Sequence, residues 1–67
     1  MTLHDAMMQV LKEGGRSMTA KEIADAINKK GLYQRGDGTP LPSSQISARA
    51  NNYPALFCKE NGLIALI

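Results

Sequence analysis

Cysteine and histidine are almost absent from this chain, which has one of each among its 67 residues. A single cysteine, Cys58, cannot form an internal disulfide, so an intracellular, reducing setting is expected. Cys58 and His4 lie far apart in the sequence and cannot by themselves supply a zinc site, so no metal or other cofactor is expected. We interpret His4 as an ordinary surface residue and Cys58 as a packing residue of a strand.

Long hydrophobic runs are also missing. No stretch approaches the ~20 apolar residues of a membrane-spanning helix, and no basic-then-apolar leader precedes the first predicted helix. We therefore expect no membrane partner, and a location in the cytoplasm of a bacterium or the nucleus of a eukaryote. The chain also lacks a His/Ser/Asp set, a phosphate-binding glycine loop and a carboxylate cluster within one predicted element, so it is not expected to be an enzyme.

The composition is that of a small globular domain. Hydrophobic residues make up 43% of the chain and charged residues 21%, which argues against disorder. A chain of this length has room for one compact core, so we expect a single domain over residues 1–67. The net charge of +2 permits nucleic-acid binding but does not require it.

The first predicted helix follows Thr2, a suitable N-cap, and stops at the pair Gly14-Gly15. Its apolar residues recur with the spacing of one buried helical face, and they are Leu3, Ala6, Met7, Val10 and Leu11.

The second predicted helix has the clearest local pattern. Thr19 and Glu22 have the spacing of a capping box, in which each side chain satisfies a backbone N–H at the helix start. The expected buried face consists of Ala20, Ile23, Ala26 and Ile27. Gly31 suits the left-handed residue after the last turn, and Leu32 is expected to fold back onto Ile27.

The third predicted helix begins at Pro42 or Ser43, after a loop rich in glycine and proline, with Ser43 or Ser44 as cap. Its inner face is expected to contain Ile46, Ala50 and Tyr53. Pro54 ends it, because the residue before a proline avoids the helical region.

The last twelve residues predict a β-hairpin, since Asn61-Gly62 is the favoured pair for a two-residue type I′ turn. In that register Phe57 pairs with Leu66 and Lys59 pairs with Ile64 on one face. The other face contains Leu56, Cys58, Leu63, Ala65 and Ile67. Both faces are mostly apolar, so either another element covers the second face or this domain is a module of a longer protein.

This order of elements predicts an α+β, mainly α fold, a winged helix-turn-helix with three helices followed by a C-terminal β-hairpin wing. The segment Arg16–Met18 is short enough to add a third strand at the edge. The expected core is Leu3, Met7, Val10, Leu11, Met18, Ile23, Ile27, Leu32, Ile46, Tyr53, Phe57, Ile64 and Leu66.

Nearly the whole chain resembles the HARE-type winged helix-turn-helix domain, a family named for homeobox-linked proteins, Additional-sex-combs-like proteins and restriction endonucleases. The similarity lies in "MTAKEI" at the start of the second helix, "GL" at its end, "TP" before the third helix, and "LFCK" followed by Gly62 in the hairpin. Ala50 is smaller than the aliphatic residue more common there in the family. The resemblance implies a DNA-binding adaptor in a restriction-modification, transcription-regulation or chromatin context.

The third helix is the candidate DNA reader, because outward residues of the second helix of a helix-turn-helix reach base edges. Helical geometry points these residues outward or to the flanks: Ser44, Gln45, Ser47, Ala48, Arg49, Asn51 and Asn52. Candidate phosphate contacts outside it are Lys29, Lys30, Arg35 and Lys59. Four to five such contacts predict modest, salt-sensitive affinity for double-stranded DNA. The alternative is an ordinary solvated helix face with no ligand.

A second hypothesis is a protein-interaction domain that docks a partner chain through the apolar outer face of the hairpin. The low net charge favours this interpretation, and Leu63 and Ile67 would then form the contact.

Overall fold

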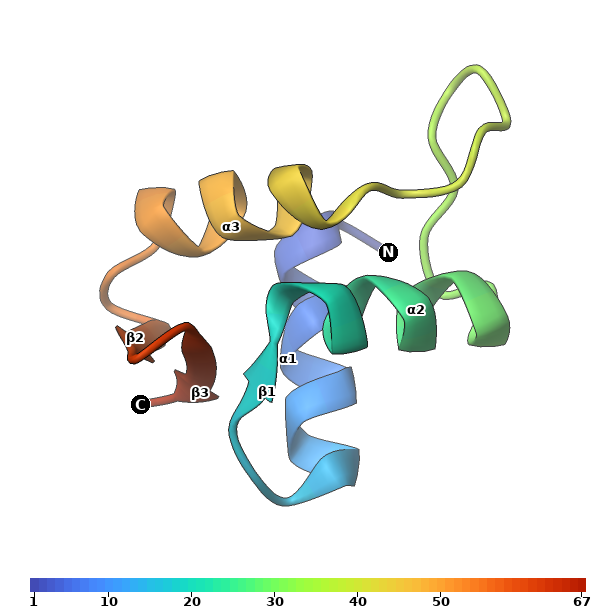
Figure 1. The fold of residues 1–67 in the computed structure, drawn as a ribbon. Coiled ribbons are helices and arrows are strands. Elements are labelled where there is room, and N and C mark those ends of the chain that lie inside the picture. The colour runs from blue at the N-terminus through green and yellow to red at the C-terminus, as the bar shows by residue number, and fades with distance from the viewer.

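A bundle of three helices packs against a small antiparallel sheet in the computed structural model, which describes residues 1–67 (Figure 1). The helices are α1 (Leu3–Gly14), α2 (Ala20–Lys30) and α3 (Ser43–Asn52), and the strands are β1 (Met18–Thr19), β2 (Phe57–Glu60) and β3 (Leu63–Leu66). This is the predicted α+β, mainly α winged helix-turn-helix. Helix α3 crosses one side of the bundle, and the hairpin lies beyond its C-terminal end.

The first two helices begin as their sequences predict. The Thr2 hydroxyl accepts a hydrogen bond from the Asp5 N–H at 3.3 Å. At the start of α2 the Glu22 N–H donates to the Thr19 hydroxyl at 3.1 Å, and the Thr19 N–H donates to the Glu22 carboxylate at 3.0 Å. Gly31 ends α2 with φ of 66°, a conformation that costs other residues roughly 1–2 kcal/mol. The predicted capping box is therefore confirmed.

The predicted cap of α3 is wrong. Pro42 occupies the N-cap position with extended backbone angles, and no side chain makes a capping hydrogen bond. Ser43 and Ser44 consequently lie inside the first turn, where a side chain is no longer placed as an N-cap. The helix ends at Asn52, close before Pro54, as expected.

The hairpin has the predicted register, with Phe57 opposite Leu66 and Lys59 opposite Ile64. Asn61 and Gly62 have φ of 54° and 79°, as a type I′ turn requires. Strand β3 is central in the sheet order β1-β3-β2.

The third strand lies slightly later in the chain than predicted. It consists of Met18 and Thr19, which pair with Ile64 and Leu63, instead of residues 16–18. Met18 thereby brings its buried side chain under the sheet, directly before the capping box begins α2.

The core contains fourteen buried residues: Leu3, Ala6, Met7, Val10, Leu11, Met18, Ile23, Ala24, Ile27, Leu41, Ile46, Ala50, Phe57 and Ile64. Leu32, Tyr53 and Leu66 were expected among them but are only partly buried and pack around the cluster.

The buried face of α2 is also shifted from the predicted one. Ala24 is buried, whereas Ala20 and Ala26 are only partly buried. Helix α2 packs against both α1 and α3, so it buries a wider face than a single stripe, and that face is centred on Ile23, Ala24 and Ile27. No helix has the length and apolar character needed to cross a membrane.

Candidate nucleic-acid interface

Helix α3 turns Ile46 and Ala50 into the core and leaves its opposite face uncovered (Figure 1). Of the seven candidate reading residues, four are exposed: Ser44, Ala48, Asn51 and Asn52. The other three, Gln45, Ser47 and Arg49, are half-buried along the two flanks of the helix. The predicted outward and flanking positions are therefore where the helix places them.

The charges around α3 differ from those of the rest of the molecule. Helix α3 contains no acidic residue, and every ion pair of the chain uses an acid of α1 or α2. Arg35, Arg49 and Lys59 form no ion pair. These three cations are thus available to an anionic ligand at the α3 surface.

Arg49 lies beside an aromatic stack that the sequence did not predict. The rings of His4 and Tyr53 are stacked, with centroids 4.5 Å apart and an interplanar angle of 24°. The Arg49 guanidinium carbon lies 6.0 Å from the Tyr53 ring centroid, within range of a cation–π interaction. His4 is therefore no ordinary surface residue, because its half-buried ring joins the N-terminus of α1 to the end of α3.

Arg35 belongs to a loop with its own hydrogen bonds. Its guanidinium donates to the Thr39 hydroxyl at 3.1 Å, and that hydroxyl donates to the Asp37 carboxylate at 2.7 Å. The hydroxyl and the N–H of Thr39 lower the pKa of Asp37, with a smaller effect from Arg35. Asp37 therefore stays negative and offsets part of the positive charge that Arg35 brings to this loop.

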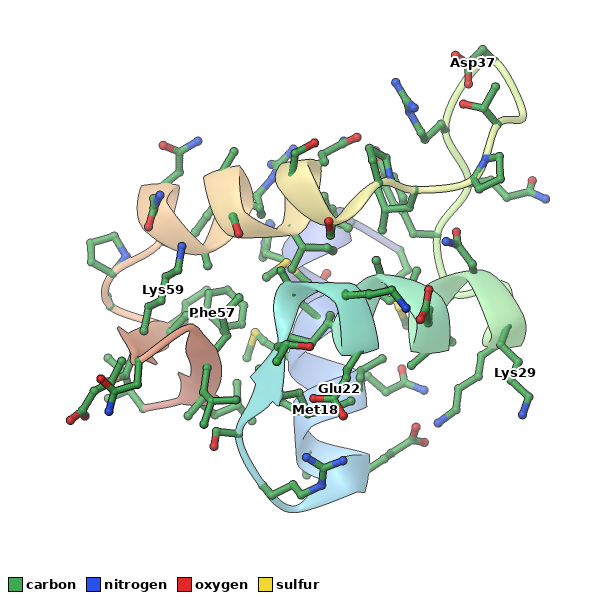
Figure 2. All side chains as sticks on the ribbon, in the orientation of Figure 1. Met18, Glu22, Lys29, Asp37, Phe57 and Lys59 are labelled. Atoms are coloured by element: carbon green, nitrogen blue, oxygen red, sulfur yellow. The ribbon has the colours of Figure 1, made fainter.

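Two of the candidate phosphate contacts do not join the others. Lys30 pairs with Glu13 at the end of α1, and Lys29 extends from α2 away from α3 (Figure 2). Lys59 instead lies on the hairpin face that it shares with Phe57, and its side chain reaches toward α3 (Figure 2). The structure thus groups Lys59 with α3 and separates Lys29 and Lys30 from it.

Asn28 and Leu41 hold the start of α3 in place, and sequence reasoning missed both. The Leu41 N–H donates to Asn28 Oδ1 at 2.9 Å, and Asn28 Nδ2 donates to the Leu41 carbonyl at 3.1 Å. Leu41 is 4% exposed. Nothing local marks an asparagine late in a helix as the partner of a residue 13 positions away.

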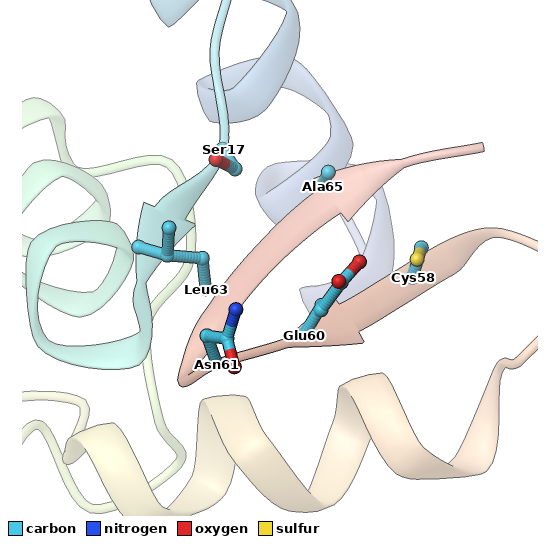
Figure 3. Close-up of a pocket in the computed structure, with 6 residues that line it drawn as sticks. All are labelled: Ser17, Cys58, Glu60, Asn61, Leu63 and Ala65. Carbon is cyan, nitrogen blue, oxygen red and sulfur yellow. The ribbon is translucent and has the colours of Figure 1, made fainter.

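The outer face of the hairpin forms a second candidate surface. Leu63 is 37% exposed and Ile67 is 77% exposed, so no other element of the chain covers them. Cys58 lies on this face and is also exposed, which corrects its interpretation as a packing residue. Ser17 borders the same face from the segment before β1 (Figure 3). No group of three or more metal-ligating side chains occurs in the structure.

Three helices, an uncovered third helix and a β-hairpin after it define a winged helix-turn-helix domain. The family model HARE-HTH, the helix-turn-helix domain of ASXL proteins and restriction endonucleases, matches residues 1–66. The chain therefore belongs to the HARE-HTH family of DNA-binding domains, which are not catalytic themselves. Comparison with curated proteins and with solved structures found no significant match.

Proposed function

We propose that this domain binds double-stranded DNA with α3 in the major groove and the hairpin wing along the sugar-phosphate backbone. The observation that carries the proposal is the surface of α3, which is free of acidic side chains and flanked by cations without acidic partners. A helix of this width fits the major groove, and the second helix of a helix-turn-helix is the one that reads it.

The polar residues of α3 match the chemistry of base edges. Gln45, Asn51 and Asn52 are amides, which pair with adenine, and Arg49 is suited to guanine. Ser44 and Ser47 are suited to phosphate or base contacts. Ala48, at the centre of the exposed face, adds little bulk and allows the backbone to approach the groove closely.

Backbone phosphates would be held by the neighbours of α3. Lys59 contacts the strand beside the wing, and Arg35 contacts the strand beside the loop before α3. Lys29 and Lys30, on the far side of α2, remain predicted contacts of lower weight, because Lys30 is already paired with Glu13. So few cations imply modest affinity that falls steeply as salt is added.

In its biological setting the domain would act as an adaptor that brings DNA to another activity. The HARE-HTH family includes domains of restriction endonucleases and ASXL proteins, so the proposed contexts are restriction-modification, transcription regulation and chromatin. Such a role places the domain in the cytoplasm of a bacterium or the nucleus of a eukaryote, as one module over residues 1–67.

A titration of double-stranded DNA at two salt concentrations tests the proposal. We expect binding at low salt that weakens at higher salt, and loss of affinity in Arg49→Ala, Gln45→Ala and Lys59→Ala. Absence of binding at low salt, or affinity that is unchanged in all three variants, would refute it.

A second candidate role is protein interaction through the outer face of the hairpin, favoured by the exposure of Leu63 and Ile67. Replacing Leu63 with glutamate should abolish association through this face while DNA binding stays intact, because Leu63 lies outside α3. Association that persists in Leu63→Glu would contradict this second role.

A further inference from the structure

The outer face of the sheet carries a shallow groove that DNA binding through α3 leaves unused. Two adjoining hollows of about 210 Å³ and 310 Å³ share Ser17 and Ala65. The first includes Leu63 and Glu60 of the hairpin (Figure 3), and the second extends to Lys12 at the end of α1. No residue of α3 lines either hollow, so the groove and the proposed DNA interface are separate surfaces.

The groove has opposite charges at its two ends and an apolar middle. Glu60 at the hairpin end and Lys12 at the α1 end both lack an ion-pair partner within the chain. Between them lie the side chains of Leu63 and Ala65. A surface with this pattern is complementary to itself after a half-turn, because each acid then faces a base.

We propose that the groove binds the same groove of a second copy of this chain, forming a two-fold symmetric dimer. The inference rests on the docking role proposed for the hairpin face and specifies its partner. Leu63 and Ala65 of the two copies remove each other from water. Two contacts between Glu60 and Lys12 fix the antiparallel orientation of the copies and disfavour other arrangements.

The dimer is expected to be weak and concentration-dependent. The chain exposes 4135 Å², and a standard protein interface takes roughly 800 Å² from each partner, which exceeds what a shallow groove offers. Because α3 takes no part, the dimer presents two reading helices related by symmetry. It would therefore favour DNA sites with two inverted half-sites.

Sedimentation equilibrium on the protein without DNA tests the dimer. The chains compared are wild type, Lys12→Glu, Glu60→Lys and an equimolar mixture of the two variants. Each variant alone should dimerise at least about tenfold more weakly than wild type, because like charges face each other in both contacts. The mixture should regain wild-type association, because each contact of the mixed dimer again joins an acid to a base.

Two results overturn the inference. The first is a wild-type chain that remains monomeric at every concentration, and the second is a mixture that associates no better than its components. Recovery in the mixture also shows that both variants are folded, since an unfolded chain presents no groove. The proposed DNA binding is judged separately, because a monomer that still binds DNA overturns only the dimer.

Discussion

The side-chain amide of Asn28 satisfies both backbone polar groups of Leu41, accepting from its N–H at 2.9 Å and donating to its carbonyl at 3.1 Å. This pair ties the end of α2 to the last residues before α3, across the long loop that joins the two helices. The buried Leu41 side chain fixes the same point from the core side. The loop can therefore be long without leaving the orientation of α3 undefined.

Asn28→Ala should destabilise the domain, because it leaves the two backbone groups of Leu41 without their partner. An unsatisfied buried polar group costs about 1–3 kcal/mol, and in a domain of this size each kcal/mol lowers the melting temperature by roughly 4–8 °C. Thermal unfolding followed by circular dichroism measures the change. Gln34→Ala is the matched control, since Gln34 is an exposed loop residue. Equal melting temperatures for the two variants would contradict this role of Asn28.

Stability should decline on acidification, because three carboxyl groups have lowered pKa values in the folded chain. The Lys30 ammonium lowers the pKa of Glu13, the Thr19 N–H lowers that of Glu22, and the Thr39 hydroxyl lowers that of Asp37. A lowered folded pKa stabilises the protein above the unfolded pKa, and this contribution disappears as pH falls through the folded value.

The free energy of unfolding should therefore be level near neutral pH and decrease below about pH 4.5. Urea unfolding at a series of pH values measures this dependence. Glu22→Gln should reduce the decrease, since its amide does not titrate. A free energy of unfolding that is constant down to about pH 3 would contradict the hydrogen bonds assigned to these carboxylates.

Tyr53→Leu should weaken DNA binding through Arg49. The Tyr53 ring restrains the guanidinium by a contact worth about 0.5–1 kcal/mol at an exposed site, so affinity should fall about two- to fivefold. Tyr53→Phe retains the ring and should bind like wild type. Fluorescence anisotropy with a labelled duplex measures both variants. If Tyr53→Leu weakens binding equally in an Arg49→Ala background, Tyr53 does not act by positioning Arg49.

Lys59 and Lys29 should differ in the salt dependence of DNA binding, although each substitution removes one lysine charge. Lys59→Ala should lower the slope of log K against log salt by roughly 0.9, the effect of losing one phosphate contact. Lys29→Ala should leave the slope almost unchanged, because this side chain extends away from α3 (Figure 2). Equal slopes for the two variants would show that the wing does not lie closer to the duplex than the end of α2.

Features formed by neighbouring residues were predictable from the sequence. The capping box needs only Thr19 and Glu22 three positions apart, and the hairpin register follows from Asn61-Gly62 at its turn. The helical stripes gave most of the core in the same way. These patterns depend on backbone geometry within a few residues, so tertiary packing does not alter them.

Features formed by distant residues were not predictable. The stack of His4 on Tyr53 joins opposite ends of the chain, and the burial of Ala24 depends on α2 packing against two helices at once. The directions of Lys29 and Lys59 depend on how α2 and the hairpin are oriented around α3. The residue types of the candidate interface were thus available from the sequence, but their grouping in space was not.

The central claim is that a DNA duplex binds the exposed face of α3 and the wing, and an NMR titration of the labelled protein with duplex DNA tests it most directly. The account predicts that the largest amide shift changes occur at Ser44, Ala48, Asn51 and Lys59, with little change at Lys12 on the opposite end of the molecule. Shift changes confined to the sheet groove around Lys12 and Ala65, with α3 unaffected, would contradict it.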